Sequence, residues 1–183
     1  MVVALVDLDL FLWTVARITG LASFTTLAVA VVTGVALRSS VLDWLANNRA
    51  MRTLHEFTTP LWLPLGAIHV VTIVLDRTAR LGTLDIVVPF RVSYAPLEIG
   101  LGTVTLDLFV LVVVTSWLRR HMDQGLWRWI HRLSYVAFAT LFAHAVLSGS
   151  DFSQPLVSAI AWSTAFALGI LAVARILFGR LPA

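Results

Sequence analysis

The chain has 183 residues, of which 59% are hydrophobic and 13% charged, and its mean hydropathy is +0.91. A soluble domain of this length could not hide so much apolar surface in one core, whereas a bilayer can solvate it. Cysteine is absent, which excludes disulfides and covalent c-type heme, and the arginines that give a net charge of +3 lie at the ends of apolar runs, which argues against a nucleic-acid partner.

Five apolar stretches are long enough to cross a bilayer, which takes roughly 20 helical residues. The first is predicted to be a retained helix and not a cleaved signal, because residues 1–10 carry Asp7 and Asp9 and no basic residue. The chain is therefore predicted to be an all-α membrane protein, a single domain over residues 1–183 built as a bundle of about five transmembrane helices. In chain order the helices are expected at residues 8–37, 53–75, 97–118, 130–147 and 155–178.

Charged residues differ between the two sides of this bundle. The side with most of the arginines is assigned to the cytoplasm by the positive-inside rule, so we expect the N-terminus outside and the C-terminus inside the cytoplasmic membrane. The 86–90 run of the long outer connection is too short to span and is expected to lie along the interface or to cap the bundle. The inner arginines are Arg38, Arg49, Arg52, Arg119, Arg120, Arg128, Arg132, Arg175 and Arg180, and the outer acidic residues are Asp7, Asp9, Asp76, Asp85, Glu98 and Asp151.

Four histidines form a regular pattern on the second and fourth helices. His55 and His69 are 14 residues apart, and His131 and His144 are 13 apart. At 1.5 Å per residue, each spacing separates two depths by about 20 Å. We therefore expect an inner pair, His55 with His131, and an outer pair, His69 with His144. Each pair can place one imidazole on either face of a heme iron, which predicts two non-covalent b-type hemes stacked across the bilayer.

Hydrogen bonding between helices and metal binding are the alternative roles for these histidines. A histidine in a membrane helix can simply hydrogen-bond a neighbouring helix, although ionisable residues in lipid are costly and usually functional. A zinc or copper site needs ligands that converge on one ion, which histidines 13 or 14 residues apart on one helix cannot do. The 13-residue spacing also turns His144 about 140° from His131, which predicts either a distorted fourth helix or hemes displaced from its axis.

The histidine pattern resembles the transmembrane domain of the ferric reductase superfamily, which includes the membrane cores of NADPH oxidases and ferric reductases and the heme-binding subunit of the periplasmic methionine sulfoxide reductase system. The likeness covers nearly the whole chain. Besides the histidine pairs, the segments that carry it are 127–135 (WRWIHRLSY), Gly149-Ser150-Asp151, Val88-Pro89-Phe90 and Ser93-Tyr94-Ala95-Pro96.

This resemblance implies two b hemes and electron flow from inside to outside. Family members reduce ferric chelates, oxygen or a periplasmic partner, so the acceptor stays open. The chain lacks the flavin and nicotinamide domain of the oxidases. A separate cytoplasmic reductase, a loosely bound flavin or a quinol is therefore expected to donate the electrons.

Three arginines and a fifth histidine lie near the paired histidines or outside their pattern. Arg17, in the first helix, is expected either to bind a propionate of the outer heme or to pair with Asp107 of the third helix. His121 lies in an inner turn outside the paired pattern and is expected to be a solvated loop residue. Arg128 and Arg132 flank His131 and are interpreted first as ordinary positive-inside anchors.

The prediction for function is a di-heme b-type transmembrane cytochrome, a heme-dependent oxidoreductase or its electron-transfer subunit. Any substrate chemistry is expected at the exposed edge of the outer heme. One alternative is a heme-binding membrane anchor for a separate periplasmic reductase. Another is a non-redox membrane scaffold or small transporter with structural histidines.

Overall fold

A computed structural model describes the backbone of residues 2–37 and 47–178 and the side chains of residues 8–37 and 47–173. Arg38 and Arg180 lie outside the described residues, and the side chains of Asp7 and Arg175 are likewise not described. The described part is helical and contains no strand. Its long helices are α1 (Val2–Ala36), α2 (Asn48–Leu75), α3 (Pro96–Trp117), α4 (Gln124–Ser148) and α5 (Pro155–Phe178).

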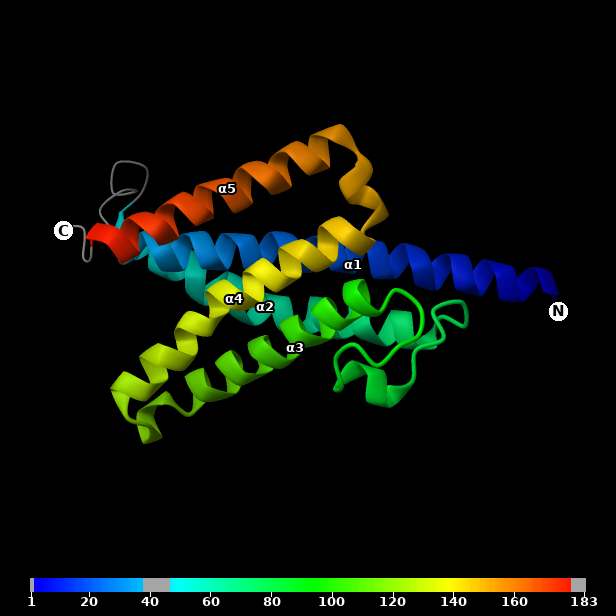
Figure 1. The fold of residues 1–183 in the computed structure, drawn as a ribbon, viewed down its shortest axis with the longest axis horizontal. Coiled ribbons are helices and arrows are strands. Elements are labelled where there is room, and N and C mark those ends of the chain that lie inside the picture. The colour runs from blue at the N-terminus through cyan, green and yellow to red at the C-terminus, as the bar shows by residue number, and fades with distance from the viewer. Residues whose placement is uncertain (1, 38–46, 179–183) are drawn as a thin grey trace.

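All five helices contain segments long and apolar enough to cross a membrane. The predicted all-α fold with five spans is confirmed, and the chain is a multi-pass membrane protein whose outer faces are solvated by lipid. The beginning of α1 and the end of α5 lie at opposite ends of the long axis, as an odd number of crossings requires (Figure 1).

Two helices begin earlier than their apolar stretches, because polar caps start them. The Asn47 side chain accepts a hydrogen bond from the Ala50 amide at 2.8 Å, so α2 begins before residue 53. The Asp123 side chain accepts from the Leu126 amide at 2.8 Å, so α4 begins before residue 130. These caps satisfy amides that a helix leaves open in its first turn. Hydropathy cannot locate such polar first turns.

The helices pack as two hairpins and a fifth helix. α1 packs along α2, and α3 packs along α4, whereas the contact between the two hairpins is looser and runs mainly between α1 and α4 (Figure 1). α5 returns beside α1 and α4 after the short helix η4 (Ser150–Ser153). Packing is therefore tighter inside each hairpin than between the two hairpins.

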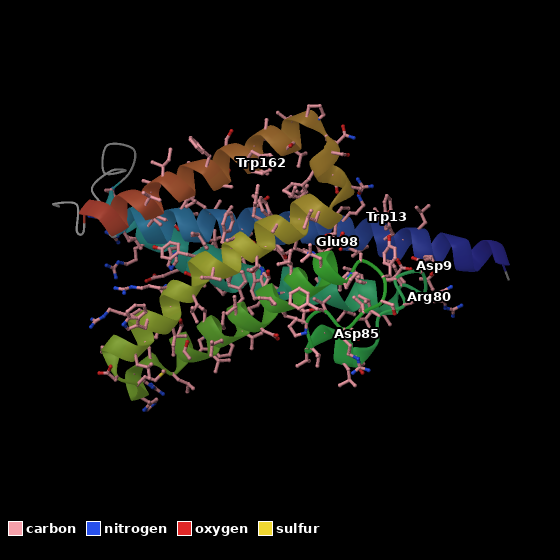
Figure 2. The ribbon with its side chains drawn as sticks, in the orientation of Figure 1. Asp9, Trp13, Arg80, Asp85, Glu98 and Trp162 are labelled. Atoms are coloured by element: carbon pink, nitrogen blue, oxygen red, sulfur yellow. The ribbon has the colours of Figure 1, made fainter. Side chains whose placement is uncertain are left out.

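Charge is sorted between the two ends of this bundle. The starts of α2 and α4 and the short helix η3 (Arg119–His121), which carry the described inner arginines, lie at one end (Figure 1). Asp9, Arg80, Asp85 and Glu98 lie toward the opposite end (Figure 2). The order of the helices therefore gathers the described inner arginines at one end of the bundle and most of the outer acidic residues at the other end.

The long outer connection packs against the beginning of α3. It contains the short helix η2 (Thr83–Ile86), whose Asp85 carbonyl accepts a hydrogen bond from Thr103 Oγ1 at 3.0 Å. Phe90 adopts the left-handed backbone conformation, with φ of 62°, and its ring lies directly against Gly100. Of the two predicted placements, these contacts favour a cap on the bundle.

Candidate functional site

His69 is held by α1 through a hydrogen bond to the backbone. Its Nδ1 lies 2.8 Å from the Ala16 carbonyl oxygen. Its ring rests on Gly20, where an added Cβ would lie only 2.9 Å from two ring atoms. A carbonyl can only accept, so Nδ1 carries the proton and Nε2 of the neutral ring keeps its lone pair. The contact fixes both the tautomer and the direction of the ring.

His55, the inner histidine of α2, is held by α1 in the same way. Its Nδ1 lies 2.8 Å from the Ala30 carbonyl oxygen, and the ring rests on Gly34, where an added Cβ would meet Cε1 at 3.1 Å. The Thr33 hydroxyl is 3.4 Å from the same Nδ1. Because α1 and α2 are antiparallel, the 14-residue spacing of Gly20 and Gly34 matches that of His69 and His55.

His144 repeats this construction in the second hairpin. Its Nδ1 lies 2.7 Å from the Glu98 carbonyl oxygen of α3, and the ring rests on Gly102, where an added Cβ would be 2.9 Å away. We call the helix carbonyl together with the glycine four residues later a histidine cradle. The three cradles are Ala16/Gly20, Ala30/Gly34 and Glu98/Gly102.

Each cradle needs a glycine four residues after its carbonyl, for a steric reason. Side chains on an α-helix tilt toward its N-terminus, so the side chain at one position covers the carbonyl one turn before it. A glycine there exposes that carbonyl, whose second lone pair can accept from a ring on a neighbouring helix. Sequence reasoning did not assign these three glycines to the site. The usable signal was the equal spacing of two glycines and two histidines.

His131 is oriented by a different contact. Its ring stacks on Trp127, one turn earlier in α4, with centroids 5.1 Å apart and planes inclined by 28°. α4 is α-helical without interruption from Gln124 to Ser148. The different directions of His131 and His144 are therefore not produced by an irregular turn. The predicted distortion of the fourth helix is wrong, and the predicted displacement of hemes from its axis stays a prediction.

The inner histidines face each other across the two hairpins. The ring centroids of His55 and His131 are 6.5 Å apart, with planes inclined by 76°. Two metal–nitrogen bonds of about 2 Å, plus about 1.1 Å from each nitrogen to its ring centroid, require roughly 6 Å between centroids. The inner pair thus has the separation that two imidazoles need to bind one metal ion from opposite sides.

His69 on α2 and His144 on α4 are the two outer histidines, and each is held by its own cradle. Within the described residues, no group of three or more His, Cys, Asp or Glu side chains could hold a metal ion. The groups that could bind a metal at the inner level are the two imidazoles of His55 and His131.

A buried aromatic layer separates the two levels. Trp62 lies seven residues from both His55 and His69 and is only 6% exposed. Its ring packs on Gly66 and lies 5.0 Å from the ring of Phe109, in a cluster completed by Leu27 and Ala137. Apolar packing of this kind keeps water out of the space between the pairs.

The structure gives Arg17 a partner that was not expected. Its guanidinium forms a two-point ion pair with Asp151 of η4, with Nε 3.1 Å from Oδ2 and a second contact through Nη2, and it also lies over the Trp13 ring. The predicted pairing with Asp107 is therefore wrong, because α1 faces the α4–α5 connection at this level and not α3. The predicted contact with a heme propionate stays a prediction.

Asp151 responds electrostatically to this contact. The hydrogen bonds and positive charge of Arg17 lower the pKa of the Asp151 carboxyl below its ordinary value of 3.8.

His121 is exposed in η3, where its Nε2 accepts a hydrogen bond from Arg120 Nε at 2.9 Å. It takes no part in either histidine pair, in agreement with its expected role as a loop residue.

Together the fold and these contacts define a class: a multi-pass helical membrane protein in which two histidines from different hairpins, His55 and His131, lie close together. Comparisons with protein-family models, with curated proteins and with solved structures find no match to this chain. Its function must therefore be argued from the site itself.

Proposed function

We propose that this protein is a di-heme b-type transmembrane cytochrome, similar to the ferric reductase superfamily. The observation that carries the proposal is the 6.5 Å separation of the His55 and His131 rings, contributed by two different hairpins. His69 and His144 are proposed to hold the second heme at the outer level. Bound heme supplies reversible one-electron chemistry of iron at a potential set by its ligands and surroundings.

The residues of the chain have distinct parts in this proposal. The four imidazoles hold iron through Nε2, and the cradle carbonyls fix the Nδ1 tautomer of three of them and increase their basicity. The aromatic layer around Trp62 excludes water between the levels. With these parts, the protein spaces two redox centres in a medium that otherwise blocks charge.

The direction of electron flow follows from the proposed orientation. The arginine-rich end, with the inner pair, is assigned to the cytoplasm, and the outer pair to the periplasmic or extracellular side of the cytoplasmic membrane. Electrons then enter from a cytoplasmic reductase, a flavin or a quinol. They leave to an acceptor outside, either a small oxidant or a periplasmic redox protein.

The decisive experiment is a reduced-minus-oxidised absorption spectrum of the protein expressed with heme available. We expect b-type bands and two hemes per chain by pyridine hemochrome assay. His55→Ala and His131→Ala should each lose about half of the heme, and so should their double variant, because all three remove the same heme. His55→Ala with His69→Ala should lose both hemes.

His121→Ala is the matched control, since this histidine lies outside the pairs, and it should keep both hemes. Absence of b-type bands would leave only a membrane scaffold with structural histidines. Loss of a heme in His121→Ala, with both retained in His131→Ala, would refute the ligand assignment.

A further inference from the structure

Asp107 is a carboxyl group halfway along a membrane-spanning helix. It lies eleven residues after Pro96 and ten before Trp117, the two ends of α3. At 1.5 Å per residue this places it about 15 Å from either end, near the midplane of a bilayer core about 30 Å thick. Among the described residues, no side chain forms a hydrogen bond or ion pair with it.

The carboxyl group lies on the side of α3 that faces away from the bundle. Phe109, whose direction differs from that of Asp107 by about 200° on an ideal helix, is 4% exposed and packs in the core. Asp107 itself is exposed, and so are the apolar residues one and two turns along on its own side. These residues are Val110 at 47%, Leu111 at 41% and Val114 at 41%.

Such a placement is unfavourable for a single chain in lipid. The neighbours of Asp107 on this face are apolar, so the surroundings are hydrocarbon and not a water-filled groove. Acidic side chains at this depth cost several kcal/mol unless they are neutral or paired, and they almost always face a protein partner. The fold supplies no such partner among the described residues, so the partner is expected from another chain.

We infer that α3 is the interface of a homodimer, in which Asp107 hydrogen-bonds its counterpart in a second copy of this chain. A two-fold axis normal to the membrane brings every residue of the interface to the depth of its own copy. A midplane carboxyl therefore meets an identical carboxyl without any further coincidence. Each protonated carboxyl donates its O–H to the carbonyl oxygen of the other, which satisfies both groups and leaves no charge in the lipid. This inference does not depend on heme.

Because the chain has no cysteine, single-cysteine variants can test the contact directly. Val110→Cys lies on the proposed interface, and Val71→Cys on α2, 54% exposed, is a control facing lipid elsewhere. In proteoliposomes treated with a mild oxidant, Val110→Cys should form disulfide-linked dimers and Val71→Cys should not. Adding Asp107→Leu should lower the yield by roughly three- to tenfold, the range expected for one hydrogen bond between membrane helices.

Asp107→Asn separates hydrogen bonding from shape and charge. An asparagine pair can still bond across the two-fold axis, so this variant should keep most of the cross-linking. Equal cross-linking of Val110→Cys and Val71→Cys, or no cross-linking of Val110→Cys, would overturn the inference. An undiminished yield with Asp107→Leu would do so too, provided that circular dichroism shows a native helix content.

Discussion

At the scale of single residues, a glycine decides how closely each cradled histidine approaches its carbonyl. At Gly20 and Gly102, a methyl group would lie 2.9 Å from the imidazole ring, and at Gly34 it would lie 3.1 Å away. The first two distances force the ring to move, and the third requires only a small adjustment. Moving the ring stretches the hydrogen bond between Nδ1 and the cradle carbonyl. It also turns Nε2 away from the opposing histidine of the proposed pair.

Alanine substitutions should therefore reduce heme content in a graded order. Gly20→Ala and Gly102→Ala should lose most of the outer heme, and Gly34→Ala should lose less, from the inner level. Gly169→Ala on α5 is the matched control, because nothing lies within 4 Å of its added methyl group. Alanine favours a helix over glycine by roughly 0.5–1 kcal/mol, so helix weakening cannot explain a loss.

The measurement is heme per chain by pyridine hemochrome, with helix content by circular dichroism. Equal heme loss in Gly169→Ala and Gly20→Ala would show that the ring contacts do not matter. Spectra recorded for each variant also report which of the two hemes has gone.

At the scale of elements, the Arg17–Asp151 pair connects α1 to the turn between α4 and α5. Arg17 directly follows Ala16, whose carbonyl holds His69, so the ion pair also supports the outer cradle. The carboxyl of Asp151 has a lowered pKa in the folded protein. Its contribution to stability is therefore complete above the ordinary value of 3.8 and disappears as the pH falls through the lowered value.

Asp151→Asn should accordingly lower the thermal unfolding midpoint at pH 7. The difference from the unmodified protein should begin to shrink as the pH falls below 3.8, and it should disappear once the pH is below the lowered pKa of Asp151, where the carboxyl of the folded protein is also neutral. Thermal unfolding in detergent across this pH range tests it. Asp9→Asn is the control, since Asp9 forms no ion pair within the described residues. A constant difference at all pH values would contradict the electrostatic account.

At the scale of the whole molecule, the five helices sort arginine-rich and acid-rich connections to opposite ends. The positive-inside rule then predicts that the turn around Met122 is cytoplasmic and that the loop around Ser93 is outside. Single-cysteine variants at these two positions can be treated in intact cells with a membrane-impermeant maleimide. Ser93→Cys should be labelled directly, and Met122→Cys only after the membrane is permeabilised. The reverse result would invert the proposed electron flow.

Hydropathy and residue spacing were enough to predict the number of spans, the matched depth of His55 and His131 and the separation of charge. Each of these is encoded locally, in hydropathy over roughly 20 residues or in spacing along one helix. The pairing depths of His55 and His131 needed only the rise per residue and the order of the helices.

Which atoms of different helices come into contact could be learned only from the tertiary structure. That Ala16 and Glu98 offer carbonyls to histidines 53 and 46 residues away depends on the register between packed helices. The same holds for Arg17, whose partner is 134 residues distant, and for Phe90 against Gly100. Register is set by the packing of side chains from several segments at once, so no single stretch of sequence contains it.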